Sequence, residues 1–474
     1  MIGITAYGGY VPFYRLSAST ANEAFGKKGG KTERAVAYYD EDSTTMAVAA
    51  SLGCLKADAA EKLDAVYFAS TTSPYREKMC AADVAAAVDA KKEVRLADYA
   101  NSLRASTAAM LGAVDAAKAG QTTLVAASDC RLGGADGPNE IAFGDAAAAF
   151  VIGSEKVLAE LVAHEMMGIN FMDTWRSDSD KIVRNWDVRY AQSLGYEPQV
   201  KEITKKILSK TGLAPADFAK IVLYAHEKRH QTALASKLGF APNQVQEAMY
   251  AKIGNTGCAA APLMLVTALE EAKPGDKILY ITYGEGCDAM VFSVTEEITS
   301  FRPETTVADY IAYGSNDLPY GKYLKWKHMI PCEPQKRPDQ ERSSLSDYFR
   351  NYKKNTALYG SRCKCCGTPQ FPPQRICANC KALDQMEPYS FRDKNATIAT
   401  FTVDGLSLSL DSPNILVVVE FEGGGKMMTY LVDCKKEDIH VNMPVKATFR
   451  QLFEANGVHT YFWKVAPKRE GGNC

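Results

Sequence analysis

Short apolar runs alternate with alanine-rich segments from the start of the chain to about residue 297. The apolar runs at residues 65–70, 124–128 and 277–282 have the length and the flanking turns of buried strands. Residues 81–90 and 105–119 are rich in alanine, which suits helices that pack closely between sheets. This alternation predicts an α/β fold built from layers.

This α/β region contains an internal repeat. Asn101 and Asn255 each precede an apolar helical segment, a Gly-containing turn and a strand. The two asparagines lie about 154 positions apart, so each copy is a half-domain and not a short solenoid repeat. We therefore expect two halves, residues 1–155 and 156–300.

The pattern changes after residue 300. Residues 301–344 hold several prolines and aromatic residues and predict a packed connector with a looser end near residues 335–344. A helix is expected at residues 345–352, within a unit that ends near residue 390. Residues 391–474 predict a small β-barrel, because they contain short strand-like runs at 396–403, 415–421, 427–431 and 461–465.

Composition and charge narrow the function classes. The 474 residues are 46% hydrophobic and 23% charged, enough for a large core in two or three domains. Lys plus Arg number 55 against 56 Asp plus Glu, and this balance argues against nucleic acid as a partner. Because no run reaches 18 apolar residues and the N-terminus reads as a first strand, we expect a cytoplasmic protein that does not enter a membrane.

Four of the thirteen cysteines form two CxxC pairs, Cys363 with Cys366 and Cys377 with Cys380. Each pair places two thiolates on one turn, and four thiolates suit the tetrahedral coordination of Zn²⁺. Since the protein supplies all four ligands, we expect structural zinc, with Cys365 as a spare thiol.

The repeat, together with Asn255-Thr256-Gly257 and Phe143-Gly144-Asp145, resembles the thiolase superfamily. Within it, the chain is most similar to the 3-hydroxy-3-methylglutaryl-CoA synthase and 3-oxoacyl-carrier-protein synthase III group. Residues 70–75 resemble a Ser-Glu-Ser-His-Pro-Tyr segment of archaeal synthases. The resemblance covers about residues 1–330, and the remainder resembles the zinc-ribbon and OB-fold proteins that accompany archaeal thiolases.

This resemblance implies a duplicated five-layer thiolase fold, a rubredoxin-like zinc ribbon and an OB-fold barrel. It also implies a coenzyme A thioester as substrate and a homodimer. The family's three catalytic positions, however, are substituted: Leu103 stands at the nucleophilic cysteine, Thr71 at the glutamate and Tyr224 at the histidine. A shift of one residue would place only Ser102 at the nucleophile position, and serine is a poorer nucleophile.

Three functional hypotheses remain open. The first is an acyl-CoA enzyme that makes or breaks a C–C bond, by aldol, retro-aldol or Claisen chemistry, without a cysteine acyl-enzyme. Its arrangement resembles the thiolase-fold aldolases that lack the cysteine and work with a zinc-ribbon/OB-fold partner. The second is a non-catalytic CoA-binding or scaffold subunit that pairs with a thiolase. The third is a synthase-like acyltransferase with a relocated nucleophile.

Candidate site residues follow from these hypotheses. Tyr224 and His226, at the end of an expected strand, are candidates for proton transfer, although Tyr224 could belong to the core and His226 to the surface. Asn255 could donate to an oxyanion or cap a helix. The candidates for binding the CoA phosphates are Lys205, Lys206 and Arg229, which could equally form a solvated face. Weaker candidates are Tyr75, Tyr283 and Glu285, while Cys258 and Cys287 read as small buried hydrophobes.

Overall fold

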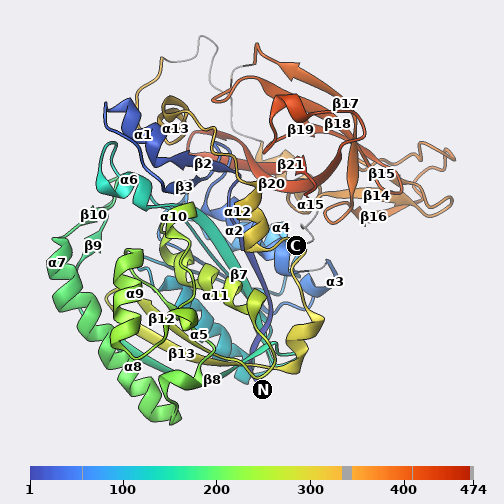
Figure 1. The fold of residues 1–474 in the computed structure, drawn as a ribbon. Helices are drawn as coiled ribbons and strands as arrows, with labels where there is room; N and C mark the ends of the chain where they lie inside the picture. The colour runs from blue at the N-terminus through green and yellow to red at the C-terminus, as the bar shows by residue number, and fades with distance from the viewer. Residues whose placement is uncertain (56, 334–343, 408, 470–474) are drawn as a thin grey trace.

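The computed structural model describes residues 1–55, 57–333, 344–407 and 409–469. The expected loose end of the connector, residues 335–344, lies outside the described residues except for Ser344. Figure 1 shows a large α/β body, with a barrel and a thin ribbon at its upper right. None of the described helices is both long and apolar enough to span a bilayer.

Nine strands form the central sheet, in the order β11-β12-β13-β8-β1-β7-β6-β4-β5. They are β1 (Gly3–Tyr10), β4 (Ala65–Ser70), β5 (Arg95–Ala100), β6 (Thr123–Cys130), β7 (Asp145–Gly153), β8 (Ala159–Gly168), β11 (Lys220–Leu223), β12 (Lys277–Tyr283) and β13 (Gly286–Val294). The order β4-β6-β7-β1 is echoed by β11-β12-β13-β8, each with one parallel pair followed by two antiparallel pairs. The two halves of the sheet are therefore copies of one unit, as the repeat predicted.

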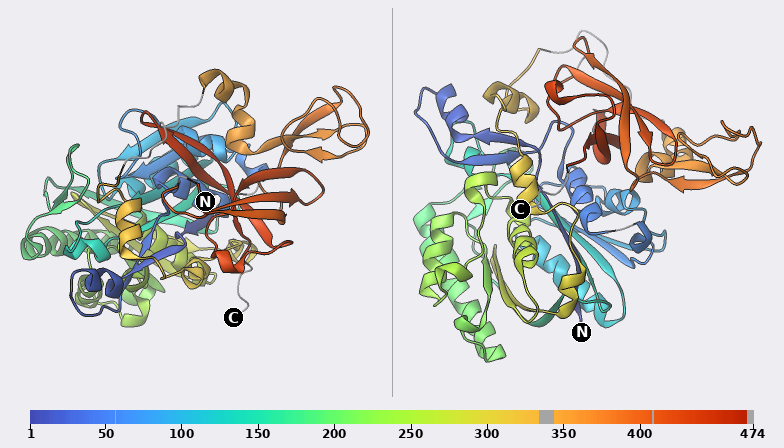
Figure 2. Two further views of the ribbon diagram at one scale, coloured as in Figure 1. Left: turned by 90° about the horizontal axis from the view of Figure 1, so that it is seen from above. Right: turned by 45° about the vertical axis from the view of Figure 1, so that its right-hand side comes forward.

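Helices cover and separate the two halves of the sheet (Figures 1 and 2). Helices α2 (Ser43–Cys54) and α4 (Ala81–Ala87) pack on the outer face of the first half, and α8 (Glu197–Thr211) and α9 (Lys228–Lys237) pack on the second. Helices α5 (Ala105–Lys118) and α11 (Ala260–Glu271) lie between the halves. All ten residues of α11 up to Leu269 are buried, because small and apolar side chains allow contact on every side. This is the five-layer arrangement of the thiolase fold.

Shorter elements complete the body and the connector. In the body they are α1 (Ala18–Ala24), β2 (Tyr14–Ser17), β3 (Glu33–Val36), α3 (Ala57–Ala60), α6 (Pro138–Ala142), β9 (Thr174–Trp175), β10 (Arg184–Asn185), α7 (Val188–Tyr190) and α10 (Tyr250–Ile253). The connector contributes α12 (Val307–Tyr313) and α13 (Tyr320–Trp326), and it is followed by α14 (Leu345–Arg350) and α15 (Tyr352–Ala357). The single helix expected at 345–352 is two helices, because Asn351 leaves the helical conformation and separates them.

The C-terminal part has a three-stranded ribbon and a five-stranded barrel. The ribbon contains β14 (Tyr359–Cys363), β15 (Pro369–Gln370) and β16 (Met386–Ser390). The barrel contains β17 (Ala396–Asp404), β18 (Asn414–Phe421), β19 (Lys426–Tyr430), β20 (Pro444–Ala455) and β21 (Val458–Pro467), in the order β19-β18-β17-β20-β21. A parallel bridge between Leu431 and Val465 joins its two ends. The sequence did not predict β20, whose buried positions include the charged Arg450.

Buried charges join the barrel to the body where β20 packs against α2. The guanidinium of Arg450 lies 3.2 Å from Asp40 and 3.0 Å from Glu41, and it also contacts Asp433. The ammonium of Lys464 lies 2.7 Å from the other oxygen of Asp40. We call these five residues the interdomain charge cluster. Because a buried charge is stable only when paired, the cluster fixes the position of the barrel on the body.

Candidate functional site

The N-terminal ends of the two central helices meet in the middle of the body. The Ser106 hydroxyl of α5 donates to the Cys258 carbonyl at the start of α11, over 2.8 Å. Beside this contact, the segment before β7 runs against the Asn255 loop: the Gly144 N–H donates to the Asn255 carbonyl over 3.0 Å. A Cβ on Gly144 would lie 1.7 Å from the Ile253 carbonyl oxygen, so only glycine allows this approach. The two motif segments thus form one site.

Asn255 is buried and holds the end of β11 in place. Its side-chain amide donates to the Tyr224 hydroxyl (3.2 Å) and to the carbonyls of Ala225 (3.3 Å) and His226 (3.4 Å), while its oxygen accepts from the Gly257 N–H (3.1 Å). Asn255, Tyr224 and His226, all predicted candidates, are therefore neighbours. Because Asn255 donates to Tyr224, the hydroxyl hydrogen of Tyr224 is free to point elsewhere.

Tyr224 stays protonated. Burial raises the pKa of its hydroxyl above the ordinary value, although the charge of Arg131 and the Asn255 hydrogen bond oppose this shift. A protonated phenol is a hydrogen-bond donor. Tyr224 can therefore donate to an oxygen of a bound molecule.

His226 forms a pair with Asp173, a residue that the sequence analysis missed. The His226 Nε2 and Asp173 Oδ2 atoms lie 3.2 Å apart, and the rings of Tyr196, Tyr224 and Tyr283 surround the imidazole. Burial raises the pKa of Asp173, but the hydrogen bond and charge of His226 outweigh it and lower that pKa below the usual range. Since the His226 side chain is 29% exposed, the imidazole is held by a carboxylate and is still accessible.

Thr71, at the expected glutamate position, is bound to a second missed carboxylate, Asp129. Asp129 is buried and accepts from five groups: the Thr71 N–H (2.7 Å), the Thr71 hydroxyl (2.9 Å), the Ser70 hydroxyl (3.1 Å), the Thr72 hydroxyl (3.2 Å) and the Cys258 N–H (2.8 Å). The carboxylate therefore connects the end of β4 to the start of α11. Its hydrogen-bonding capacity is used within the protein.

Leu103 lies in the turn between β5 and α5, partly buried against the core. A Cβ on Gly284 would lie 3.3 Å from the Leu103 Cβ, so the leucine packs against the turn between β12 and β13. The neighbouring Ser102 hydroxyl donates to Glu285 over 2.9 Å. Burial raises the pKa values of the Cys258 and Cys287 thiols, which disfavours their thiolates.

The three basic candidates for the CoA phosphates lie on the surface of the second half. Lys206 pairs with Glu202 (2.6 Å) on α8, and Arg229 pairs with Glu227 (2.6 Å) at the start of α9. Lys205 lines a shallow depression with Lys206 and Glu165. Of the weaker candidates, Tyr283 lies beside His226, while Tyr75 contacts the barrel through the His459 N–H.

The four predicted zinc ligands come together in the ribbon. The sulfur atoms of Cys363, Cys366, Cys377 and Cys380 all lie within 4.8 Å of one another, with 3.6 Å between Cys363 and Cys380 and 3.5 Å between Cys366 and Cys377. Tetrahedral Zn–S bonds of about 2.3 Å place sulfurs about 3.8 Å apart, so the donor set fits Zn²⁺. Cys365 is exposed and lies outside this set.

Comparisons with known proteins agree with this architecture. Residues 208–294 match the 3-oxoacyl-[acyl-carrier-protein] synthase III C-terminal family, residues 354–386 match the ChsH2 rubredoxin-like zinc ribbon family, and residues 392–450 match the ChsH2 C-terminal OB-fold family. The hydroxymethylglutaryl-CoA synthase of Methanopyrus kandleri is 30% identical over 343 residues, which cover 69% of this chain and 98% of that protein. The synthase of Aeropyrum pernix is 30% identical over 68% of this chain and 93% of its own length.

Solved structures show the same fold. A structure of HMG-CoA synthase complexed with CoA superposes with a TM-score of 0.64 at 18% identity, covering 73% of this chain and 94% of that one. The 3-oxoacyl-[acyl-carrier-protein] synthase III of Aquifex aeolicus has a TM-score of 0.55 at 24% identity, covering 62% of this chain and all of its own.

Proposed function

Because this chain belongs to the hydroxymethylglutaryl-CoA synthase family, we propose that it makes or breaks a C–C bond in an acyl-CoA, without a cysteine acyl-enzyme. The observation that carries this proposal is the pair of His226 and Asp173, which supplies an acid/base group where Leu103 leaves no nucleophile. The preferred reaction is aldol addition or retro-aldol cleavage of a β-hydroxyacyl-CoA. This reaction requires proton transfer and stabilisation of an enolate, but no covalent intermediate.

In the cleavage direction, His226 takes the proton of the β-hydroxyl group. The Cα–Cβ bond then breaks, its electron pair forms the enolate of the shortened thioester, and the β-carbon leaves as an aldehyde or ketone. The imidazolium returns its proton to Cα of the enolate, so the histidine is regenerated. Asp173 is the positioning residue, because its carboxylate orients the imidazole and stabilises the imidazolium.

Tyr224 is the candidate donor to the thioester oxygen. Its hydroxyl stays protonated, and Asn255 fixes its position by a hydrogen bond. A donor held in this way stabilises developing negative charge without reorganising. Lys205, Lys206 and Arg229 remain our candidates for the CoA phosphates, in competition with the acidic neighbours that they already face.

Zinc in this proposal is structural, since all four coordination positions belong to cysteines. The expected homodimer also stays a proposal.

The second function, a non-catalytic CoA-binding subunit that pairs with a thiolase, also stays a proposal. It is favoured by one observation: the Asn255 amide and the Asp129 carboxylate are already occupied within the protein.

The first experiment is denaturing intact-mass spectrometry after incubation with acetyl-CoA and acetoacetyl-CoA. The wild type is compared with Ser102→Ala and Cys258→Ala. We expect CoA binding and no acyl adduct. An adduct that disappears in either variant would establish a relocated nucleophile, the third hypothesis, and overturn the non-covalent one.

The second experiment measures aldehyde or ketone release from a series of β-hydroxyacyl-CoA thioesters. We expect His226→Asn to lower kcat about 100-fold or more, the usual contribution of a general base, with little change in CoA affinity. Asp173→Asn should lower kcat in the same direction. His440→Asn, which removes an exposed imidazole of the barrel, is the matched control. CoA binding without turnover of any thioester would favour the non-catalytic subunit.

A further inference from the structure

Residues 173–186, which we call the site hairpin, contain β9 and β10 and lie across the candidate site. The Arg176 guanidinium donates to the carbonyl of Thr71, directly after β4. The Val183 N–H donates over 3.0 Å to the carbonyl of Leu132, two positions after β6. The site hairpin therefore covers the ends of two strands of the first half. Figure 1 shows β9 and β10 at the edge of the body away from the barrel.

The base of the site hairpin reaches the second half of the body. Asp173, its first residue, pairs with His226 beyond the end of β11, over 3.2 Å. The Trp186 N–H closes the hairpin by donating to the Asp173 carbonyl over 2.8 Å. The carboxylate that orients the imidazole thus belongs to the hairpin and not to the central sheet. A movement of the hairpin relative to the sheet therefore separates Asp173 from His226.

Few contacts hold the site hairpin to the body, and most of them face water. Its two strands have two residues each and pair only with each other. Within the described residues, the bond from Val183 is the only backbone hydrogen bond between the hairpin and the rest of the chain. The ion pair of Asp178 with Arg76 joins side chains that are 83% and 69% exposed. A segment held in this way opens at a low cost in free energy.

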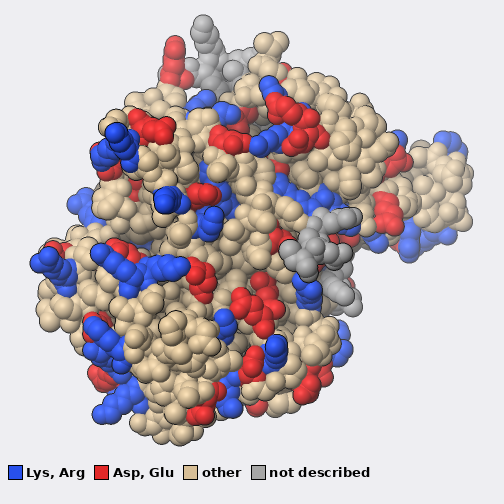
Figure 3. Space-filling model, in the orientation of Figure 1, with Lys and Arg blue, Asp and Glu red and all other residues tan. Residues whose placement is uncertain are grey.

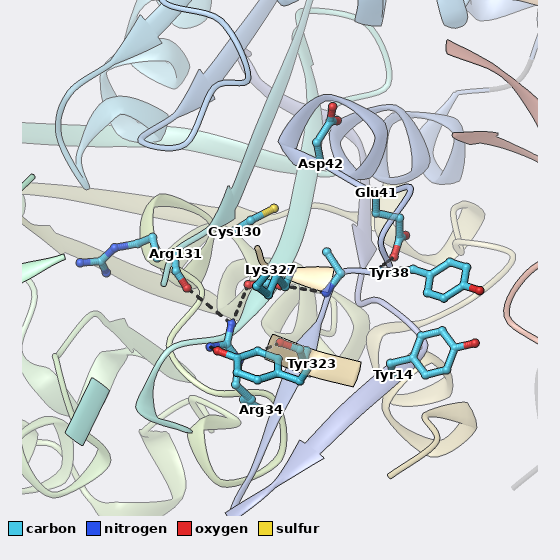
Figure 4. Close-up of polar contacts among 12 residues, drawn as sticks. Tyr14, Arg34, Tyr38, Glu41, Asp42, Cys130, Arg131, Tyr323 and Lys327 are labelled. Atoms are coloured by element: carbon cyan, nitrogen blue, oxygen red, sulfur yellow. Dashed lines mark hydrogen bonds and ion pairs between the residues drawn. The ribbon is translucent and has the colours of Figure 1, made fainter. Parts of the chain in front are cut away.

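The surface under the hairpin, in contrast, is firmly held. Arg34 is buried and binds Asp145 over 2.9 Å, and Lys327 binds the other oxygen of that carboxylate over 2.8 Å. Arg34 also donates over 3.4 Å to the carbonyl of Arg131, directly before Leu132. Figure 4 shows these contacts at the start of the loop after β6. The hairpin is therefore the side of this contact that can move.

The arrangement in the structure leaves the candidate donor out of reach. Tyr224 and Asn255 are each 2% exposed. The proposed reaction nevertheless requires the Tyr224 hydroxyl to touch the thioester oxygen. Because the packed core around the central sheet does not open easily, the loosely held hairpin is the cover that must move to admit a substrate.

We propose that the site hairpin is a lid that opens to admit the acyl-CoA and closes over the bound thioester, returning Asp173 to His226. The structure shows the closed form. A thioester touches both the hairpin and the sheet only in this form, so its binding favours closure. The acid/base pair is complete only when the lid is closed, and the closed lid keeps water from the enolate. The coupling to catalysis rests on the proposed function, whereas the movement needs only ligand binding.

Tryptophan fluorescence can follow the site hairpin. Trp175 and Trp186 lie in it, and the other two tryptophans, Trp326 and Trp463, are buried elsewhere. We expect saturating acetoacetyl-CoA, with binding established by calorimetry, to reduce acrylamide quenching of the wild type. The reduction should be lost in Trp175→Phe/Trp186→Phe. Unchanged quenching of the wild type with bound thioester would overturn the lid, and so would a reduction that persists in the double variant.

Trypsin tests the movement independently, because the hairpin exposes Arg176, Lys181 and Arg184. We expect cleavage at these residues in the free protein and slower cleavage with acetoacetyl-CoA bound. Arg76→Ala, which removes the ion pair with Asp178, should speed cleavage of the free protein.

Lys118→Ala is the matched control for Arg76→Ala, because it removes an exposed ion pair with Asp115 on α5. It should leave cleavage of the hairpin unchanged. Equal cleavage rates of the wild type with and without bound thioester would contradict the lid.

The lid and the catalytic function can fail separately. Protection of the hairpin by a bound thioester, without turnover of any β-hydroxyacyl-CoA, would confirm the lid and refute the catalytic function. Turnover without protection would do the opposite. In an active protein, Arg76→Ala should lower kcat/KM, because Asp173 and His226 are paired less often. Faster cleavage of the hairpin at an unchanged kcat/KM would overturn the coupling.

Discussion

Glu270, in the last turn of α11, gives stability a pH dependence that can be traced to one residue. Its carboxylate accepts from the Val307 N–H over 3.0 Å, and burial raises its pKa from 4.5 to about 7, with the charges of Asp309 and Glu271 contributing. Between these two values the folded state binds more protons than the unfolded state. The free energy of unfolding should therefore fall as pH rises from about 4.5 to about 7.

Glu270→Gln is expected to reduce this decline, because the amide oxygen still accepts from Val307 and no longer titrates. The measurement is the urea midpoint at pH 5, 6, 7 and 8. Glu297→Gln is the control, since Glu297 is exposed and is not among the charges that raise the pKa of Glu270. Equal pH slopes in the wild type and Glu270→Gln would contradict the assignment.

At the same scale, the sequence named three candidate residues that the structure brings together, but not the residues that contact them. Asn255, Tyr224 and His226 could be named because a repeat and a strand end mark them. Asp173, Asp129 and Arg131 belong to other segments, and only the fold brings them to the site. Polar residues directly after the run at 124–128 were the one local signal for Asp129 and Arg131, since strand ends in α/β proteins often carry site residues.

The zinc ribbon is the element whose stability depends most directly on a ligand. Its strands are short and its four cysteines surround a common point. We expect one zinc ion per chain, lost in Cys377→Ser, with faster proteolysis of the ribbon because folding and metal binding are coupled there. Metal content and limited proteolysis measure both effects.

Cys365→Ser is the control for this prediction, because its thiol lies between two ligands in sequence and outside the cluster. Zinc content should stay at the wild-type level. Loss of zinc in this variant, or its retention in Cys377→Ser, would show that the ligand set is wrong.

The sequence predicted the strands whose residues are nearly all buried. It missed the strand in which buried and exposed residues, apolar and charged, are mixed. The runs at 65–70 and 124–128 lie in β4 and β6, and the alanine-rich 105–119 segment is α5. Strand β20 went unnoticed because it carries Lys446, Arg450 and Glu454 among its apolar positions. Its burial comes from contact with the body, which no local pattern records.

At the scale of the whole molecule, the interdomain charge cluster should make the barrel and the body unfold together. Arg450→Met leaves Asp40, Glu41 and Asp433 without their shared guanidinium. Breaking a buried pair from one side usually costs about 3–5 kcal/mol, so we expect a lower urea midpoint and earlier proteolytic release of the barrel.

Arg375→Met is the comparison for this variant. Arg375 pairs with Asp384 on the ribbon, with side chains 80% and 50% exposed, and such a solvated pair contributes little to stability. Equal destabilisation by the two substitutions would mean that the cluster does not hold the barrel.

The arrangement of the whole molecule was predicted in kind, with a thiolase-fold body, a zinc ribbon and an OB-fold barrel. In Figure 3, basic and acidic residues are intermixed over the visible face. The docking of the barrel was not predicted, since it depends on pairs such as Asp40 and Arg450, which are 410 positions apart.

Because Asp40 and Arg450 are far apart in the sequence, the ribosome makes them at different times. Asp40 leaves the ribosome long before Arg450 exists, and at roughly 5–20 residues per second the wait is on the order of 20–80 seconds. During that time the nascent body carries two carboxylates, Asp40 and Glu41, at a face that is still open to water. The barrel can therefore dock through this cluster only after Arg450 has left the ribosome, and until then Asp40 and Glu41 stay hydrated.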